Sequence, residues 1–268
     1  MRFAAFAAMA QRLGVEAIEI RNDLPGAEIA DGTPACDVAA AARAHGLTLR
    51  SINALQLFDQ YDATRAEQAR ALVRYAVDSG AQALVLCPTN SRSDQRSDTR
   101  RHADLVHALR NLQPLLADNG LTGLIEPLGF AQCAVRRKSQ AVRAIRELRS
   151  NTTFALVHDT FHHHLAGEGL FFPELTGLVH ISGVEDPALG VLDMRDKHRL
   201  LVGPADRLGN VAQLRTLLAA DYCGYVSFEP FAAEITAATD IEQRLAASLA
   251  YLSDALAASG GVYANSVR

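Results

Sequence analysis

Four residues able to bind a divalent metal ion occur at the ends of successive apolar segments in the second half of the chain. A glutamate follows "LTGLI", an aspartate follows "TFALVH", a histidine lies inside "GLVHIS" and a second glutamate follows "YVSF". They are Glu126, Asp159, His180 and Glu229. Three carboxylates with one imidazole suit Mn²⁺ or Co²⁺, and both Zn²⁺ and Mg²⁺ also accept such ligands. One acidic residue at a strand end can simply cap the next helix, but four in succession indicate a shared metal site.

The segment "VHDTFHHHL" places further histidines around Asp159. His158 precedes this aspartate in an expected strand, so the alternation of side chains directs it away from the metal side. His163 and His164 are expected on the first turn of the next helix, either exposed or packed. His162 lies three residues after Asp159 and is either a hydrogen-bond partner for a substrate hydroxyl or a structural residue.

Apolar segments of strand length alternate with amphipathic segments of helix length. The expected strands are 15–20, 47–53, 81–87, 121–126, 153–159, 177–182 and 225–229, and helical patterns include 4–13, 35–46, 63–80 and 99–120. Strands that are apolar at nearly every position are typical of a parallel sheet covered by helices. Glycines near the helix ends, at 46, 80 and 120, look like C-caps. Since no glycine-rich phosphate loop follows any strand, the sequence predicts an α/β fold of the (β/α)8 TIM-barrel class.

The predicted barrel is incomplete at the front, with a first strand that is short or missing. A closed barrel needs eight strands, but the chain begins almost directly in the helix 4–13. Residues 1–3 would then form a vestigial strand, or the barrel would be open. A start assigned roughly a dozen residues too late, about one strand and its loop, is the third explanation. No linker rich in Pro, Gly or Ser divides the chain, so residues 1–268 are expected to form one domain with a flexible tail at about 259–268.

The composition excludes several classes of protein. Hydrophobic residues make up 49% and charged residues 21% of the chain, which allows a full core, and the net charge of −4 argues against nucleic-acid binding. The N-terminal segment lacks a secretory cleavage pattern, and no apolar run is long enough to span a membrane. The scattered cysteines suit reduced, buried thiols of a cytoplasmic protein; they are Cys36, Cys87, Cys133 and Cys223.

Several longer stretches resemble one enzyme family. They are "GLIEPLGFAQC", "VHDTFHHHLAG", "LVHISGVEDPALGVLDMRDKHRLLVGP" and "YVSFEPF", with a looser likeness in "IEIR" and "INALQLF". They are similar to the xylose-isomerase-like TIM-barrel family of sugar isomerases and epimerases, and within it to the bacterial inosose isomerases. The resemblance implies one divalent metal ion, with the ligands Glu126, Asp159, His180 and Glu229. It also implies that His162 and Arg199 contact substrate oxygens.

The implied activity is a metal-dependent isomerisation or epimerisation of an inosose-type keto-polyol or a ketose, a small-molecule sugar or polyol substrate. A proton next to the carbonyl is removed through an enediolate that the metal ion stabilises. Glu126 and Glu229 would be the catalytic base and acid, and Asn53, at the end of the strand 47–53, is a further candidate substrate contact. The family's usual Trp-Pro-Gly-x-Gly loop reads "LLVGPADRLGN" here, and Phe130 stands where the closest relatives tend to carry histidine. These departures leave the substrate open.

The sequence also allows other functions for the chain and other roles for some of these residues. A dehydratase on the same barrel uses similar ligands, a DNA-repair endonuclease would need more ligands and a basic face, and the incomplete barrel would suit a non-catalytic paralogue. Arg199 could instead anchor its loop through Asp193 or Asp196. The run "SRSDQRSDTRRH" (91–102) is either a phosphate site or, as we prefer, a solvated loop and helix start. No interface signature decides whether the chain forms a homo-oligomer.

Overall fold

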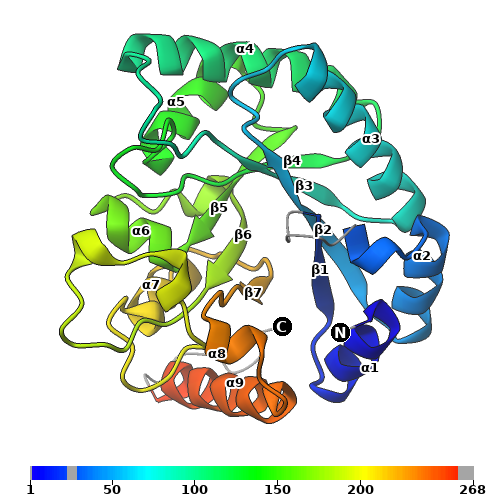
Figure 1. Cartoon of the computed structure of the whole chain (residues 1–268), viewed down its shortest axis with the longest axis vertical. Coiled ribbons are helices and arrows are strands. Elements are labelled where there is room, and N and C mark those ends of the chain that lie inside the picture. Colours follow the sequence, from blue (N-terminus) through cyan, green and yellow to red (C-terminus); the bar gives the residue numbers. More distant parts are fainter. Residues whose placement is uncertain (1, 23–28, 259–268) are drawn as a thin grey trace.

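The computed structural model describes residues 2–22 and 29–258, in which seven parallel strands form one sheet in the order of the chain. The strands lie at the centre and the helices surround them (Figure 1). The strands are β1 (Ala17–Arg21), β2 (Thr48–Gln56), β3 (Ala83–Cys87), β4 (Thr122–Ile125), β5 (Phe154–Asp159), β6 (Thr176–Ile181) and β7 (Val226–Phe228). This arrangement confirms the predicted TIM-barrel class. The expected tail at about 259–268 lies outside the described residues.

The helices follow the strands as the sequence pattern predicts. They are α1 (Phe3–Arg12), α2 (Ala35–Ala44), α3 (Ala63–Ser79), α4 (Asp98–Ala117), α5 (Lys138–Leu148), α6 (Thr160–Ala166), α7 (Asn210–Leu218), α8 (Ala233–Thr236) and α9 (Ile241–Ala257). Short 3-10 turns occur at Ile29–Gly32, Pro173–Leu175, Val191–Asp193 and Asp196–His198. The expected glycine cap of α3 is confirmed, because Gly80 is left-handed at φ 74°.

Side chains alternate between the two faces of each strand, and this alternation positions the site. In β3, Ala83, Val85 and Cys87 pack in the cluster inside the barrel, whereas Leu84 and Leu86 pack against the helices. The same rule holds along the later strands, where the inward series ends in polar residues at the carboxyl ends. A TIM barrel builds its active site at this end, so the apolar interior supports a polar rim.

The sheet is open between β1 and β7, which are its edges in the described part of the chain. Of the residues 1–3 proposed as a vestigial strand, Met1 lies outside the described residues, and Arg2 and Phe3 are not in a strand, because α1 already begins at Phe3. Ion pairs cross the opening instead: Arg12 of α1 binds Glu242 of α9 at 2.6 Å, and Arg21 of β1 binds Glu229 after β7 at 2.5 Å. Figure 1 shows α1 and α9 on the two sides of this opening.

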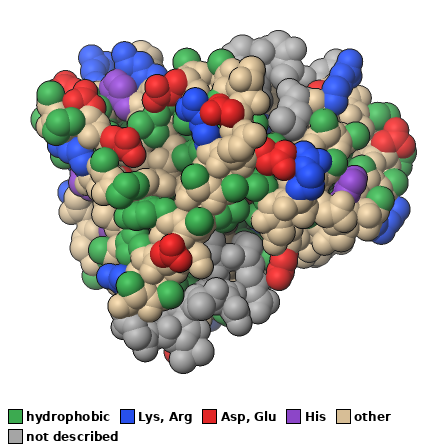
Figure 2. Space-filling model, turned by 90° about the horizontal axis from the view of Figure 1, so that it is seen from below, with side chains coloured by type: hydrophobic (Ala, Val, Ile, Leu, Met, Phe, Trp, Pro, Cys, Tyr) green, Lys and Arg blue, Asp and Glu red, His purple; other side chains and the backbone are tan. Residues whose placement is uncertain are grey.

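Acidic and basic side chains are interspersed on the face seen from below rather than gathered into a patch of one sign (Figure 2). None of the described helices is long and apolar enough to cross a membrane. All four cysteines are free thiols, as expected, and Cys87 and Cys133 are buried. The expectation of burial is wrong for Cys36 and Cys223, which are exposed because they lie on α2 and in the turn before β7, outside the barrel core.

Candidate metal centre

The four predicted ligands converge at the carboxyl end of the barrel. Glu126 follows β4, Asp159 ends β5, His180 lies in β6 and Glu229 follows β7. One ligand atom from each lies within 4.8 Å of those of the other three, and all four residues are buried. Neighbouring strands of a sheet are about 4.8 Å apart, so residues at equivalent positions on successive strands can surround one ion.

His180 is enclosed by carboxylates and is completely buried. Its Nδ1 lies 2.9 Å from Oε1 of Glu126 and 3.3 Å from Oε2 of Glu229, and its Nε2 lies 3.1 Å from Oε1 of Glu19. Burial alone would lower the pKa of His180, but the charges of Glu229, Glu19 and Glu126 raise it well above the ordinary value. Nδ1 faces Glu126 and Glu229 and is the nitrogen that would bind a metal ion, whereas Nε2 faces Glu19.

Arg199 holds two of the predicted ligands together. Its Nη2 donates to Oδ2 of Asp159 at 2.5 Å and to Oε2 of Glu229 at 2.8 Å, and its Nε donates to Ser182 at 2.9 Å. The guanidinium also lies 5.1 Å from the ring centre of Phe161 and is only 1% exposed. Burial would lower the pKa of Arg199, but Asp159 and Glu229 raise it, so this side chain is a fixed positive charge.

Loop anchoring is part of the role of Arg199, because its Nη1 also lies 3.4 Å from Oδ1 of Asp196. That carboxylate is half exposed, whereas those of Asp159 and Glu229 are buried. An ion pair is screened far less in a buried position than at the surface. The two buried contacts therefore dominate, and they place Arg199 at the cluster itself.

Glu229 is held by further donors at its other oxygen. Its Oε1 accepts from Nδ2 of Asn53 at 2.9 Å and from Arg21 at 2.5 Å. Burial would raise the pKa of Glu229, but His180 and Arg199 lower it well below the ordinary value, so the carboxylate stays ionised. The Oδ1 atom of Asn53 is buried and has no hydrogen-bond partner among the described residues. An unpaired buried acceptor is costly, and its presence here fits a ligand-binding position.

His162 lies beside the cluster and is buried. Its backbone N–H donates to Oδ1 of Asp159 at 2.8 Å, which caps α6, and its Nε2 lies 3.5 Å from Nη1 of Arg199. Phe130 packs edge-on against its ring at 5.5 Å. Within the described part of the chain its Nδ1 finds no partner, so His162 offers a second unsatisfied polar atom next to the cluster.

One cavity of about 240 Å³ brings the predicted residues together. Its lining includes Asn53, Glu126, Phe130, His162, Arg199 and Glu229, together with Arg21, Gln56, Cys87, Asn90 and Phe231. Asp159 and His180 do not line it. A ligand in the cavity can therefore contact the two glutamates, Asn53, His162 and Arg199, whereas the other two predicted metal ligands do not reach the cavity.

His158 and His163, the neighbours of Asp159 and His162, do not line the cavity, and for His158 this agrees with the predicted alternation. His158 points between sheet and helices, where its Nδ1 lies 2.7 Å from Nζ of Lys138 and its Nε2 lies 2.9 Å from the side-chain oxygen of Gln213. Burial and Lys138 lower the pKa of His158 well below the ordinary value. His163 packs against His158, and burial lowers its pKa to about 3. Both imidazoles are therefore neutral structural groups.

Sequence reasoning singled out Asn53 of β2 but missed Glu19 and Arg21 of β1 and Ser51 of β2. Glu19 contacts His180 across the open side of the sheet and accepts a short hydrogen bond from the hydroxyl of Ser51, and Arg21 binds Glu229. The signal was present in "AIEIR", where Glu19 and Arg21 alternate with apolar Ile18 and Ile20. A charged residue at an inward strand position requires a buried partner, which in this chain lies more than 150 residues away.

The donor set fits a divalent ion. Carboxylate oxygens with one imidazole nitrogen are ligands that Mn²⁺, Co²⁺ and Zn²⁺ accept. The nearby positive charges of Arg21 and Arg199 offset part of the negative charge of the carboxylates. Glu19 accepts from the outer nitrogen of His180, which is the usual way that a metal-binding histidine is oriented. The buried Glu126, Asp159, His180 and Glu229 are consistent with a divalent metal site.

Comparisons with solved structures agree with this architecture. A xylose isomerase domain containing protein from Salmonella typhimurium LT2 is 32% identical with a TM-score of 0.86, over 94% of this chain and 93% of that chain. The IOLI protein, whose crystal structure contains a zinc atom, is 19% identical with a TM-score of 0.80, over 96% and 94%. D-psicose 3-epimerase from Clostridium cellulolyticum H10 is 15% identical with a TM-score of 0.74, over 96% and 94%.

Among curated protein sequences, none matches the chain. The family model described as "Xylose isomerase-like TIM barrel" matches residues 7–255, which is nearly the whole chain. The buried cluster of two glutamates, an aspartate and a histidine lies inside the matched region. The chain belongs to the xylose isomerase-like TIM barrel family.

Proposed function

We propose that the protein is a divalent-metal-dependent isomerase or epimerase of a ketose or an inosose-type keto-polyol. The observation that carries this proposal is the buried four-residue cluster beside a polar cavity of about 240 Å³. A metal ion bound there would act as a Lewis acid on a carbonyl and its neighbouring hydroxyl. The inosose class rests on the sequence stretches that resemble inosose isomerases.

The two glutamates have different surroundings, which suggests different roles. Both oxygens of Glu229 accept hydrogen bonds from cationic or amide donors, and its pKa is lowered. Glu126 contacts His180 through Oε1, whereas its Oε2 accepts a long 3.4 Å contact from the Cys87 thiol. A weakly bonded carboxylate oxygen is the better proton acceptor. Glu126 therefore takes the proton from carbon and returns the same proton at the adjacent carbon, whereas Glu229, which stays ionised, would hold the metal ion on the other side.

The cationic and polar groups of the cavity would bind the substrate. Arg199 and His162 meet at 3.5 Å and face the cavity, where they donate to hydroxyl or developing oxyanion oxygens. The unsatisfied Oδ1 of Asn53 would accept from a substrate hydroxyl. Asp159 and His180, which do not line the cavity, would serve only as metal ligands.

The first test is the metal content of protein purified without chelator, compared with the double variant Asp159→Asn/His180→Gln. We expect close to one metal ion per wild-type chain and almost none in the double variant, because two of four ligands are lost. His164→Gln, a partly exposed neighbour on α6, serves as a matched control and should retain the metal. A folded wild type that binds no Mn²⁺, Co²⁺ or Zn²⁺ after incubation would refute the proposal.

The second test detects proton abstraction directly. Metal-loaded protein is incubated in D₂O with a panel of inososes and ketoses, and proton NMR follows deuterium incorporation next to the carbonyl. Glu126→Gln should slow exchange by about 10² to 10⁴-fold, the usual contribution of a general base. Exchange at wild-type rate in this variant would remove Glu126 from the role of base. Accumulation of a conjugated, ultraviolet-absorbing product would identify a dehydratase instead.

A further inference from the structure

A second cavity, larger than the catalytic one, lies beside it at the carboxyl ends of β2 and β3. Its volume is about 640 Å³. We call it the β2–β3 groove, and it is lined by Gln60, Tyr61, Ser91, Arg96, Asp104 and His107, among others. The same two chain segments line both cavities, the end of β2 with its following loop and the loop after β3: Gln56 and Asn90 line the catalytic cavity, whereas Gln60 and Thr89 line the groove. Thr89 and Asn90 are consecutive residues, with Cα atoms about 3.8 Å apart, so the two cavities meet the loop after β3 at adjacent positions.

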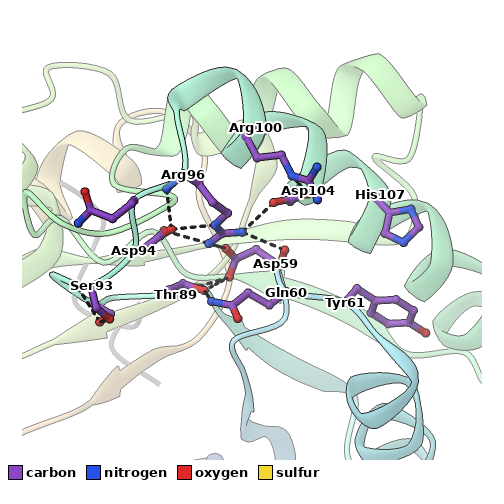
Figure 3. Close-up of a pocket in the computed structure, with 12 residues that line it drawn as sticks. Asp59, Gln60, Tyr61, Thr89, Ser93, Asp94, Arg96, Arg100, Asp104 and His107 are labelled. Atoms are coloured by element: carbon purple, nitrogen blue, oxygen red, sulfur yellow. Dashed lines mark hydrogen bonds and ion pairs between the residues drawn. The ribbon is translucent and has the colours of Figure 1, made fainter.

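The floor of the groove is fixed by Arg96, which lies at the centre of Figure 3. Its guanidinium donates to Asp94 at 2.9 Å, to Asp104 at 3.0 Å and to Asp59 at 2.7 Å. Asp59 is buried and also accepts the backbone N–H of Thr89 at 2.6 Å and its hydroxyl at 3.0 Å. Both loops are thereby tied to one preorganised polar surface.

The positive and negative charges of this floor balance, which favours a neutral ligand over a charged one. Arg96, Arg100 and Arg101 each contact Asp94 or Asp104, at distances between 2.8 and 3.2 Å. All five N–H donors of Arg96 are engaged by protein oxygens. A phosphate would have to displace these carboxylates and approach their negative charges. The arginine-rich run is therefore a structural network and not a phosphate site, and its carboxylate oxygens can accept from neutral hydroxyl groups.

An aromatic surface borders one end of this polar floor. Tyr61 and His107 lie together in Figure 3, with ring centres 6.2 Å apart and an angle of 72° between the rings. Gln60, the residue before Tyr61, donates to the Thr89 hydroxyl at 2.8 Å and lines the groove. An amphipathic ring beside amide, hydroxyl and carboxylate groups presents an apolar face together with hydrogen-bonding partners. A sugar ring has the matching surface, with C–H groups on its faces and hydroxyls around its edge.

We propose that the β2–β3 groove binds a second, neutral sugar ring, so that the preferred substrate is a glycoside of the reacting ketose or keto-polyol. The inference rests on the proposed function, because the reacting ring must lie at the metal cluster for the second ring to reach the groove. The groove then sets specificity through binding, and the chemistry remains at Glu126 and Glu229.

The test compares D-fructose with three glucosyl-fructoses, turanose, maltulose and isomaltulose, and with fructose 6-phosphate. Calorimetry on the Mn²⁺-loaded full chain gives each dissociation constant, and deuterium exchange gives each kcat/KM. We expect at least one disaccharide to bind roughly tenfold or more tightly than fructose, which corresponds to about 1.4 kcal/mol. Tyr61→Leu should abolish that gain and Tyr61→Phe should retain it. Tyr251→Leu, a partly buried tyrosine of α9 outside the groove, is the matched control and should leave the gain intact.

The outcomes separate the two proposals. Turnover of fructose without any gain for the disaccharides, a gain that persists in Tyr61→Leu, or a preference for fructose 6-phosphate each overturns the sugar subsite and leaves the isomerase proposal standing. A disaccharide gain that Tyr61→Leu abolishes, without exchange of any substrate under any metal ion, supports the subsite and refutes the isomerase proposal. Because Tyr61→Phe and circular dichroism report folding independently, loss of structure in Tyr61→Leu would be recognised, and Gln60→Ala then repeats the test.

Discussion

Replacing Arg199 by methionine should destabilise the metal-free protein much more than the metal-loaded protein. The guanidinium bridges Asp159 and Glu229 at 2.5 and 2.8 Å and is 1% exposed. Removing one partner of a buried ion pair leaves uncompensated charge and costs about 3 to 5 kcal/mol. Methionine replaces the cation–π contact of the guanidinium with Phe161 by an apolar contact. The loss is a large part of the stability of a typical domain, about 5 to 15 kcal/mol.

A bound divalent ion would supply the missing positive charge to the same two carboxylates. The free energy of unfolding lost in Arg199→Met should therefore fall by about 2 kcal/mol or more when Mn²⁺ is saturating, since a ligand that binds only the folded state stabilises it. Urea unfolding followed by circular dichroism measures both values, because the chain contains no tryptophan for fluorescence. Arg146→Met is the control, because Arg146 forms a 3.5 Å ion pair with Glu174 in which both side chains are exposed. Such a pair contributes less than about 1 kcal/mol to the free energy of unfolding.

Equal losses with and without Mn²⁺ would show that Arg199 acts by packing rather than by charge. The electrostatic account of the cluster would then be wrong. If metal-free Arg199→Met were as stable as the metal-free wild type, the electrostatic account would be refuted more directly. Asp159 and Glu229 would then not need a cation between them to remain close together.

Three further changes test other parts of the structure. Burial lowers the pKa of Lys138 to about 7 from the ordinary 10.5. Between these pH values the unfolded chain binds one proton more than the folded chain, so the free energy of unfolding should rise with pH, by up to about 4 to 5 kcal/mol. Lys138→Met should flatten that rise in urea unfolding at pH 7, 8 and 9, and an unchanged slope would contradict the lowered pKa. Glu19→Gln removes the carboxylate at 3.1 Å from His180 and should weaken metal affinity about 10 to 100-fold in a competition assay with a chelator, whereas unchanged affinity would make Glu19 a bystander. Gly129→Ala would place a Cβ atom 2.2 Å from the carbonyl oxygen of His162, at a residue with φ of +71°. We expect the free energy of unfolding to fall by several kcal/mol, measured by thermal unfolding. A melting temperature within 1 to 2 °C of wild type, which corresponds to about a few tenths of a kcal/mol, would show that the loop adapts.

The architecture and the four clustered residues were accessible from the chain alone. Runs such as "ALVLC" have apolar residues at every position, as is typical of a parallel strand that is covered on both faces. The barrel then gathers the ends of successive strands on one side, so Glu126, Asp159, His180 and Glu229 could be grouped before their positions were known. The spacing of apolar residues and the order of strands and helices can both be seen in the sequence, so the fold class and the four clustered residues could be predicted from it.

The contacts around these residues were decided only by tertiary structure. Glu19 and His180 are 161 residues apart, and Arg21 and Glu229 are 208 apart, so no local pattern connects them. The open edge between β1 and β7 places these pairs together, because an inward charge on β1 must find its partner across the opening. The choice of Asp159 and Glu229 as the main partners of Arg199 likewise depends on burial, since nearby Asp196 is half exposed.

The β2–β3 groove shows the same division between sequence and structure. The run of arginines, serines and aspartates at 91–102 indicated a loop followed by a capped helix start, and Ser97 indeed accepts the backbone N–H of Arg100 at the start of α4. The cavity itself needs Asp59 and Tyr61 from the preceding loop, and the pairing of Arg96 with three carboxylates determines that its floor is balanced in charge. Charge balance depends on distances between side chains, and only the folded chain fixes those distances.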